Sequence, residues 1–204
     1  MSRDPERGLA QFFGGRVCLD FANTIDWRLS AEPQELIPDY ATFLRWSGMR
    51  GILPAAAIAR LQKQAARNPA AANAALEEVH MLRAEICRAA TALCRGETLA
   101  LAPFNHRLAS LPPQPPLVSA DAGYVHELPG KALDEPLWPV LWSLSALLTS
   151  QDATRLGSCQ AQDCGWFFVD ESPNHSRLWC SSEVCGNRER ARRAYAKRRS
   201  AAPA

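Results

Sequence analysis

Along most of the first 150 residues, apolar positions recur every three or four residues, the spacing of one face of an α-helix. The longest such stretch starts at Asn68 and Pro69, a favourable N-cap followed by a favourable first helical residue, and runs to Gly96. Its mainly apolar stripe consists of Leu76, Val79, Leu82, Arg83, Ile86, Ala90 and Leu93. Shorter helices are predicted over residues 38–48 and 54–65.

A further helix is predicted from Asp134, as its cap, to about Ser150, and it is apolar around most of its circumference. Its apolar residues are Leu137, Trp138, Leu141, Trp142, Leu144, Leu147 and Leu148. A helix of this kind is either buried in the protein or lies at an interface. Both interpretations stay open, and a homodimer seam is one expectation.

The remaining segments of the first 155 residues are less regular. Residues 17–25 fit the alternation of a strand and also the spacing of a helix. A helix over residues 97–109 is interrupted by Pro103, and the proline-rich residues 111–117 favour a rigid connector over an SH3-type ligand. Residues 117–128 predict a β-hairpin with its turn at residues 121–123. The fold class is therefore α+β, with a mostly helical N-terminal domain that contains a small β-hairpin.

Composition excludes several classes of protein. The chain has 204 residues, of which 47% are hydrophobic and 22% charged, values that exclude overall disorder and a fibrous repeat. No run of 18 apolar residues predicts a transmembrane helix, and residues 1–7 lack the apolar core of a signal peptide. We expect a soluble, cytoplasmic protein without a membrane partner.

Charge is distributed unevenly along the chain. The formal net charge is +2, yet residues 186–204 hold seven Lys or Arg and one Glu. A basic end on a mildly acidic body indicates a polyanionic partner, although a solvated terminus is the simpler alternative.

Four of the seven cysteines form two matched pairs, Cys159 with Cys164 and Cys180 with Cys185, in the pattern C-x4-C-x15-C-x4-C. Two such pairs can supply the four tetrahedral thiolates that zinc prefers. Four thiolates leave no open coordination position, so we predict one structural zinc rather than a catalytic one. Four unrelated buried cysteines, a redox dithiol, and His175 as a replacement ligand are less favoured alternatives.

The residues around the two pairs predict a small zinc finger. Residues 166–170 and 176–179 are strand-like and flank a turn, which indicates a hairpin between the pairs. The basic stretch that follows predicts a helix whose apolar face (Val184, Ala191 and Tyr195) lies against that hairpin. Arg190, Arg193 and Lys197 lie opposite, in solvent, where they can contact nucleic-acid phosphates.

Residues 185–188 spell CGNR, and with the three preceding cysteines they resemble the CGNR zinc-finger family. Residues 17–24 (VCLDFANT) are similar to the opening of the ABATE domain that precedes this finger. The resemblance implies an ABATE-like regulatory domain over residues 1–155. It implies a treble-clef-like finger, a hairpin plus a basic C-terminal helix, over residues 156–204. It also implies a role as a stress-induced bacterial transcription regulator.

In such a protein the four cysteines bind zinc. Asn187 and Arg188 either contact DNA or hold the finger together, and both roles stay open.

Three hypotheses follow. The first is a DNA-binding regulator whose body senses a small-molecule effector or forms oligomers. The second is a small-molecule-binding protein with a purely structural finger, in which Asp20, Asn23 and Arg28 line a pocket, although N-capping and surface pairing also explain these three. The third is a zinc module for RNA or protein. We expect no enzyme, because the sequence has no Gly-rich phosphate loop, HExxH motif or nucleophile elbow.

Overall fold

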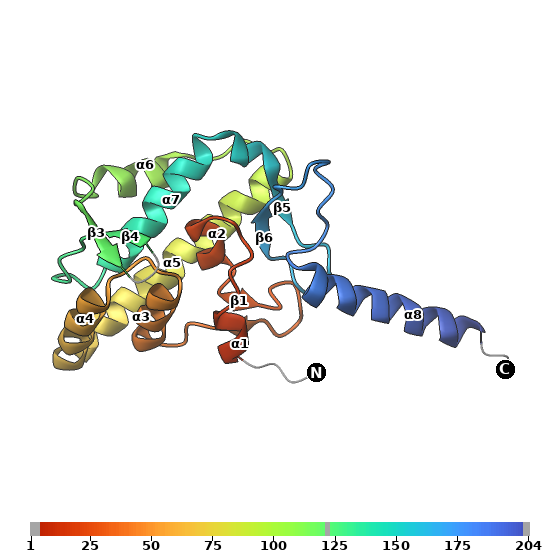
Figure 1. The fold of residues 1–204 in the computed structure, drawn as a ribbon, viewed down its shortest axis with the longest axis horizontal. Coiled ribbons are helices and arrows are strands. Elements are labelled where there is room, and N and C mark those ends of the chain that lie inside the picture. The colour runs from red at the N-terminus through yellow and green to blue at the C-terminus, as the bar shows by residue number, and fades with distance from the viewer. Residues whose placement is uncertain (1–4, 121–122, 202–204) are drawn as a thin grey trace.

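The computed structural model describes residues 5–120 and 123–201 and shows a helical body from which the C-terminal helix extends (Figure 1). The α-helices are α1 (Pro5–Leu9), α2 (Val17–Ala22), α3 (Tyr40–Met49), α4 (Ala55–Arg67), α5 (Pro69–Cys94), α6 (Ala102–Ala109), α7 (Trp138–Leu148) and α8 (Asn187–Ala201). Two 3-10 helices, η1 (Glu135–Leu137) and η2 (Gln151–Arg155), flank α7, and a short π-helix, η3 (Ser182–Gly186), precedes α8.

The strands form three antiparallel pairs. They are β1 (Ile25–Asp26) with β2 (Gln34–Glu35), β3 (Leu117–Ala120) with β4 (Gly123–His126), and β5 (Leu156–Ser158) with β6 (Phe167–Val169). The β3–β4 hairpin confirms the predicted one; its register pairs Leu117 with His126, and residues 121–122 of the predicted turn lie outside the described residues. The α+β prediction is confirmed.

The core is organised around α5, which is 26 residues long and spans about 39 Å at 1.5 Å per residue. Its predicted cap is confirmed, since the Asn68 side chain accepts a hydrogen bond from the Ala71 amide at 3.1 Å. The face that carries Val79, Leu82 and Ile86 is fully buried. Helices α2, α3 and α4 pack against α5.

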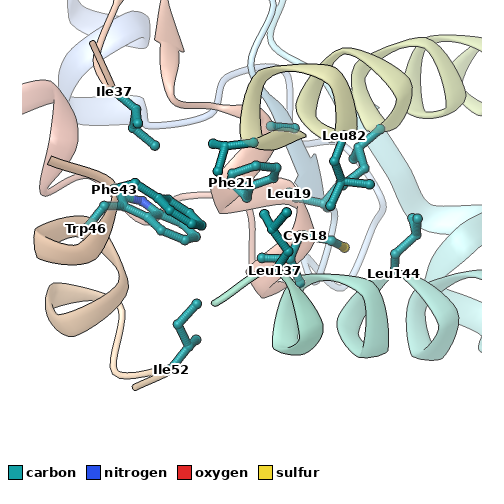
Figure 2. Close-up of a cluster of buried hydrophobic side chains, with 14 of the residues drawn as sticks. Cys18, Leu19, Phe21, Ile37, Phe43, Trp46, Ile52, Leu82, Leu137 and Leu144 are labelled. Atoms are coloured by element: carbon teal, nitrogen blue, oxygen red, sulfur yellow. The ribbon is translucent and has the colours of Figure 1, made fainter. Parts of the chain in front are cut away.

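The ambiguous segment is the helix α2. Cys18, Leu19 and Phe21 are all fully buried, so this short helix has no exposed side, and its apolar pattern imitates a strand. Figure 2 shows these side chains with Phe43 and Trp46 of α3. The rings of Phe43 and Trp46 stack with centroids 6.1 Å apart.

Helix α7 lies on the opposite side of α2 from α5, and its apolar face is used inside the body. The buried residues are Val140, Leu141, Leu144 and Leu147. This packing favours the buried interpretation of the apolar helix; a homodimer stays a prediction. The side chain of Asp134 does not cap the helix. The helical segment begins instead with the 3-10 helix η1. The carboxylate of the next residue, Glu135, accepts hydrogen bonds from the backbone amides of Lys131 and Ala132.

Two other expectations change. Pro103 lies in the first turn of α6 rather than interrupting a longer helix, because proline fits the position where no amide partner is required. Residues 176–179 are not a strand; β6 pairs with β5, which precedes the first cysteine pair. The first pair therefore lies in the hairpin connection, and the returning segment adds a hydrogen bond from the Gln160 amide to the Leu178 carbonyl. Within the described residues, no helix is long and apolar enough to cross a membrane.

Candidate metal centre

The four predicted cysteines converge on one point. Their Sγ atoms all lie within 4.8 Å of one another, with Cys164 and Cys180 3.7 Å apart and Cys180 and Cys185 3.5 Å apart. Four sulfurs about 2.3 Å from a tetrahedral zinc would be about 3.8 Å apart, whereas a disulfide would bring two of them to about 2.05 Å. The spacing therefore fits a metal ion and not disulfides.

Each cysteine pair belongs to a tight backbone turn, which we call a knuckle (residues 159–164 and 180–185). In the first, the Cys159 amide donates to the Trp166 carbonyl at 2.7 Å and the Cys164 amide to Ala161 at 3.0 Å. Gly165 follows with a φ of 67°, and a Cβ there would lie 2.6 Å from Leu29 Cγ. Glycine is thus required where this knuckle touches the body.

The second knuckle leads directly into α8. The Ser181 hydroxyl accepts a hydrogen bond from the Val184 amide at 3.2 Å, and the Gly186 amide donates to the Ser181 carbonyl at 3.0 Å. These bonds curl residues 182–186 into η3, with Cys185 in its last turn. The zinc ligand and the first residues of α8 therefore belong to one continuous backbone unit.

All four cysteines are buried, between 2% and 3% exposed, which bears on their protonation. Hydrogen bonds from the other three sulfurs lower the pKa of Cys159, whereas hydrogen bonding to Cys159 raises that of Cys164. Four thiols this close cannot all ionise without a cation among them. A thiolate set that demands a cation is the donor chemistry that zinc prefers, so the residues fit the metal.

Arg177 organises the finger, a role that was not predicted from the sequence. Its guanidinium donates to the carbonyls of Val169, Trp179, Cys180 and Phe13, and it stacks 4.2 Å from the Phe168 ring centroid. One side chain thereby satisfies carbonyls from β6, the returning segment and the body. No motif surrounds Arg177, so the sequence carried no signal for this role.

The finger is docked on the body through Asn23 and its neighbours. Asn23 is 3% exposed, and its side-chain amide both donates to the Phe167 carbonyl at 2.9 Å and accepts the Phe167 amide at 2.8 Å. Trp166 Nε1 donates to the Ile25 carbonyl at 2.8 Å, and the Leu29 amide donates to Asp163 at 3.0 Å. The apolar side chains of finger and body form one continuous core.

The other two residues of the predicted pocket are also engaged with protein atoms. Asp20 is buried and accepts hydrogen bonds from the Gly14 amide at 2.8 Å and from Arg50 Nε at 2.7 Å. Arg28 donates to the Gly165 carbonyl and stacks 4.3 Å from the Phe167 ring centroid. These contacts give the side chains structural roles, and a ligand pocket formed by them stays a prediction.

The first turn of α8 is held by contacts inside the finger and by one contact with the body. Asn187 donates to the Glu183 carbonyl at 2.8 Å and accepts a hydrogen bond from Arg190 at 2.5 Å. Arg188 contacts Cys185 Sγ at 3.5 Å and lies 4.2 Å from the Trp27 ring centroid. Both CGNR side chains therefore have structural contacts, while a role in DNA binding stays a prediction for them.

Beyond its first turn, α8 extends away from the body (Figure 1), although Arg192 still contacts Gln162 and Asp163 of the first knuckle. Residues 190–199 are all exposed, which places Arg190, Arg193 and Lys197 in solvent as expected. The predicted apolar face is wrong, because Ala191 is exposed and Tyr195 is 64% exposed.

Comparisons with known proteins agree with this geometry. Residues 155–198 match the family described as CGNR zinc finger, and residues 15–151 match the family ABATE, described as "Putative stress-induced transcription regulator". No curated protein matches the chain. The ABATE match spans most of the chain and the four-cysteine cluster lies inside the finger match. The chain therefore belongs to the ABATE family of regulators and carries a CGNR zinc finger in which Cys159, Cys164, Cys180 and Cys185 hold one structural zinc.

Proposed function

We propose that this zinc-binding regulator binds duplex DNA through α8. The observation that carries the proposal is the exposure of every residue from 190 to 199 on a helix that extends beyond the body (Figure 1). At 1.5 Å per residue, the 15-residue helix is about 22 Å long, and an α-helix fits the major groove of B-DNA.

The composition of α8 supports a polyanionic partner. Six of its exposed residues are basic: Arg190, Arg192, Arg193, Lys197, Arg198 and Arg199. Arg193 and Lys197 are four residues apart, a spacing at which like charges repel along a helix. With no apolar face docked on the body, this repulsion is not offset by packing, and DNA phosphates would offset it.

The zinc platform sets the direction of the helix. Arg192 donates to Asp163 and Gln162 of the first knuckle, both at 2.9 Å, and to Glu189 of α8 at 2.8 Å. The second knuckle is continuous with the start of the helix, so both knuckles fix its base. Loss of zinc should therefore weaken DNA binding even though no ligand faces the nucleic acid.

The test is binding of a fluorescent duplex to the full zinc-loaded chain, measured by anisotropy over a range of salt. If Arg190, Arg193 and Lys197 each neutralise one phosphate, log Kd should change with log salt with a slope of about 3 per protomer. The double variant Arg193→Gln/Lys197→Gln should bind at least about tenfold more weakly and lose about two units of slope.

A matched control is Lys63→Gln/Arg67→Gln, which removes two exposed charges four residues apart on α4. This control should keep the wild-type slope. Absence of binding at low salt, or equal losses in both double variants, would contradict the proposal. Stronger competition by structured RNA than by duplex DNA would favour the RNA-binding alternative.

The role we propose is not enzymatic. Four thiolates fill the coordination of a zinc ion, so no position is left for a substrate or water. The centre is then a structural support for α8 and not a site of chemistry.

We also propose that the body senses a small molecule. A cavity of about 680 Å³ lies where η2 meets the finger. It is lined by Gln151, Thr154, Arg155, Leu156, Gly157, Phe168, Asp170, His175 and Arg177. A ligand here would touch the end of the body and the finger at once. A metabolite that raises the Tm of the wild-type chain and not of Arg155→Gln would support this site, and equal shifts in both would place its binding elsewhere.

A further inference from the structure

Two arginines that lack a carboxylate partner among the described residues flank the cysteine cluster, one from the body and one from the finger. Arg188, the last residue of the CGNR motif, places one guanidinium nitrogen 3.5 Å from Cys185 Sγ. Its Cζ lies 4.2 Å from the centroid of the Trp27 ring, which belongs to the body. The side chain thus bridges a zinc ligand and a body residue.

Arg28 belongs to the body and reaches the end of the first knuckle. It donates to the carbonyl of Gly165, the residue after Cys164, and lies over the Phe167 ring at 4.3 Å. Burial lowers the pKa of the Arg28 guanidinium, and the nearby thiols of Cys87, Cys164 and Cys94, that of Cys87 most strongly, act in the opposite direction. Arg28 is therefore a partly buried cation that lies next to the first knuckle and has cysteine thiols near it.

Both guanidiniums have an unsatisfied nitrogen. The Nε atoms of Arg28 and Arg188 are buried and have no hydrogen-bond partner, and neither side chain forms an ion pair with a carboxylate in the described part of the chain. A buried charge without a counter-charge is costly. Such cations persist where something else supplies negative charge.

The zinc centre supplies this negative charge. One Zn²⁺ with four thiolates carries two negative charges, and the four sulfurs are buried. We infer that Arg28 and Arg188 balance these two charges, so that zinc affinity depends on the docking of the finger against residues 27–28 of the body. The body is in this sense part of the metal centre, and loss of zinc leaves two partly buried cations whose Nε atoms have no partner, which favours undocking.

The inference makes opposite predictions for the zinc-bound and zinc-free chain. In the zinc-bound chain, Arg28→Gln and Arg188→Gln remove a compensating charge. Outer-shell substitutions of this kind weaken metal binding by about 10- to 100-fold. In the zinc-free chain the same substitutions remove an uncompensated, partly buried cation, so they should leave the Tm unchanged or raise it.

The experiment measures the zinc Kd of the full-length chain by competition with a chromogenic chelator at fixed pH, together with Tm values with and without zinc. The matched control is Arg60→Gln. Arg60 also donates to backbone carbonyls, those of Leu128 and Pro129, yet contacts no sulfur in the described part of the structure. We expect both test variants to weaken zinc binding at least about tenfold while the control stays within about twofold of wild type.

Arg188→Lys separates charge from shape, because lysine keeps the charge and loses the planar stack on Trp27. It should retain zinc better than Arg188→Gln. The inference is overturned if the test variants keep a wild-type zinc Kd, if they lower the Tm equally with and without zinc, or if the lysine variant is no better than glutamine. None of these outcomes involves DNA, so this test and that of the proposed function fail separately.

Discussion

Replacing Asn23 with alanine tests how the finger is attached to the body. The side-chain amide of Asn23 hydrogen-bonds to β6 as a neighbouring strand would. It donates to the carbonyl of Phe167 and accepts a hydrogen bond from the amide of the same residue. Phe167 is 1% exposed, so water cannot replace the lost hydrogen bonds. Each unsatisfied buried group costs about 1–3 kcal/mol, so for the two groups we expect the free energy of unfolding to fall by about 2–6 kcal/mol.

The assay is equilibrium unfolding of the zinc-loaded chain in urea, followed by tryptophan fluorescence. Asn23→Asp is a second variant: it keeps an acceptor for the Phe167 amide but turns its other oxygen toward the Phe167 carbonyl, so it should be at least as unstable as the alanine variant. Asn105→Ala, at an exposed position of α6, is the control and should change stability by less than about 0.5 kcal/mol. A loss below about 1 kcal/mol for Asn23→Ala would refute the docking role.

Three further predictions concern other parts of the molecule. Cys159→Ser and Cys185→Ser should each abolish stoichiometric zinc binding, measured by elemental analysis of the purified chain, because three thiolates leave the buried site incomplete. Burial raises the pKa of Cys18 to about 12, so an alkylating reagent at a pH of about 8 should modify exposed Cys94 and leave Cys18 intact until the protein unfolds, as mass spectrometry of the labelled peptides would show. Glu135→Ala removes a carboxylate that is 1% exposed and accepts hydrogen bonds from three backbone amides. Because these amides lose their partner, the free energy of unfolding should fall by about 2–4 kcal/mol in a urea titration.

The metal centre was predictable because metal binding imposes strict spacing on the chain. Two cysteine pairs with equal internal spacing point to a tetrahedral site whatever the surrounding fold is. Local signals were similarly informative. The Asn68 cap of α5 depends only on residues near it in sequence, and the structure confirms it.

Features that depend on distant partners could not be predicted. The strand at residues 167–169 was visible, but its partner β5 was not, because an alternating pattern does not identify the strand that pairs with it. The outer part of α8 was expected to pack on the hairpin. Its small apolar face would permit such packing, but Ala191 and Tyr195 are exposed in the structure.

The polar residues of the body show a similar limit. Asn23 and Arg28 stand out in an apolar segment, which indicates a buried role, but the sequence does not say whether the partner is a ligand or the protein's own backbone. Here the partners are the carbonyl and amide of Phe167 and the carbonyl of Gly165. Both partners lie more than 130 residues away in sequence, beyond the range of any local pattern.

Amide hydrogen exchange of the full zinc-loaded chain, with and without a DNA duplex, tests most directly whether α8 is a separate nucleic-acid-binding helix. We expect the amides of residues 191–199 to exchange quickly in the free protein, since all of these residues are exposed, and slowly in the complex, while exchange at the buried face of α5 is unchanged. Slow exchange of this segment in the free protein, or protection by DNA confined to the body, would contradict it.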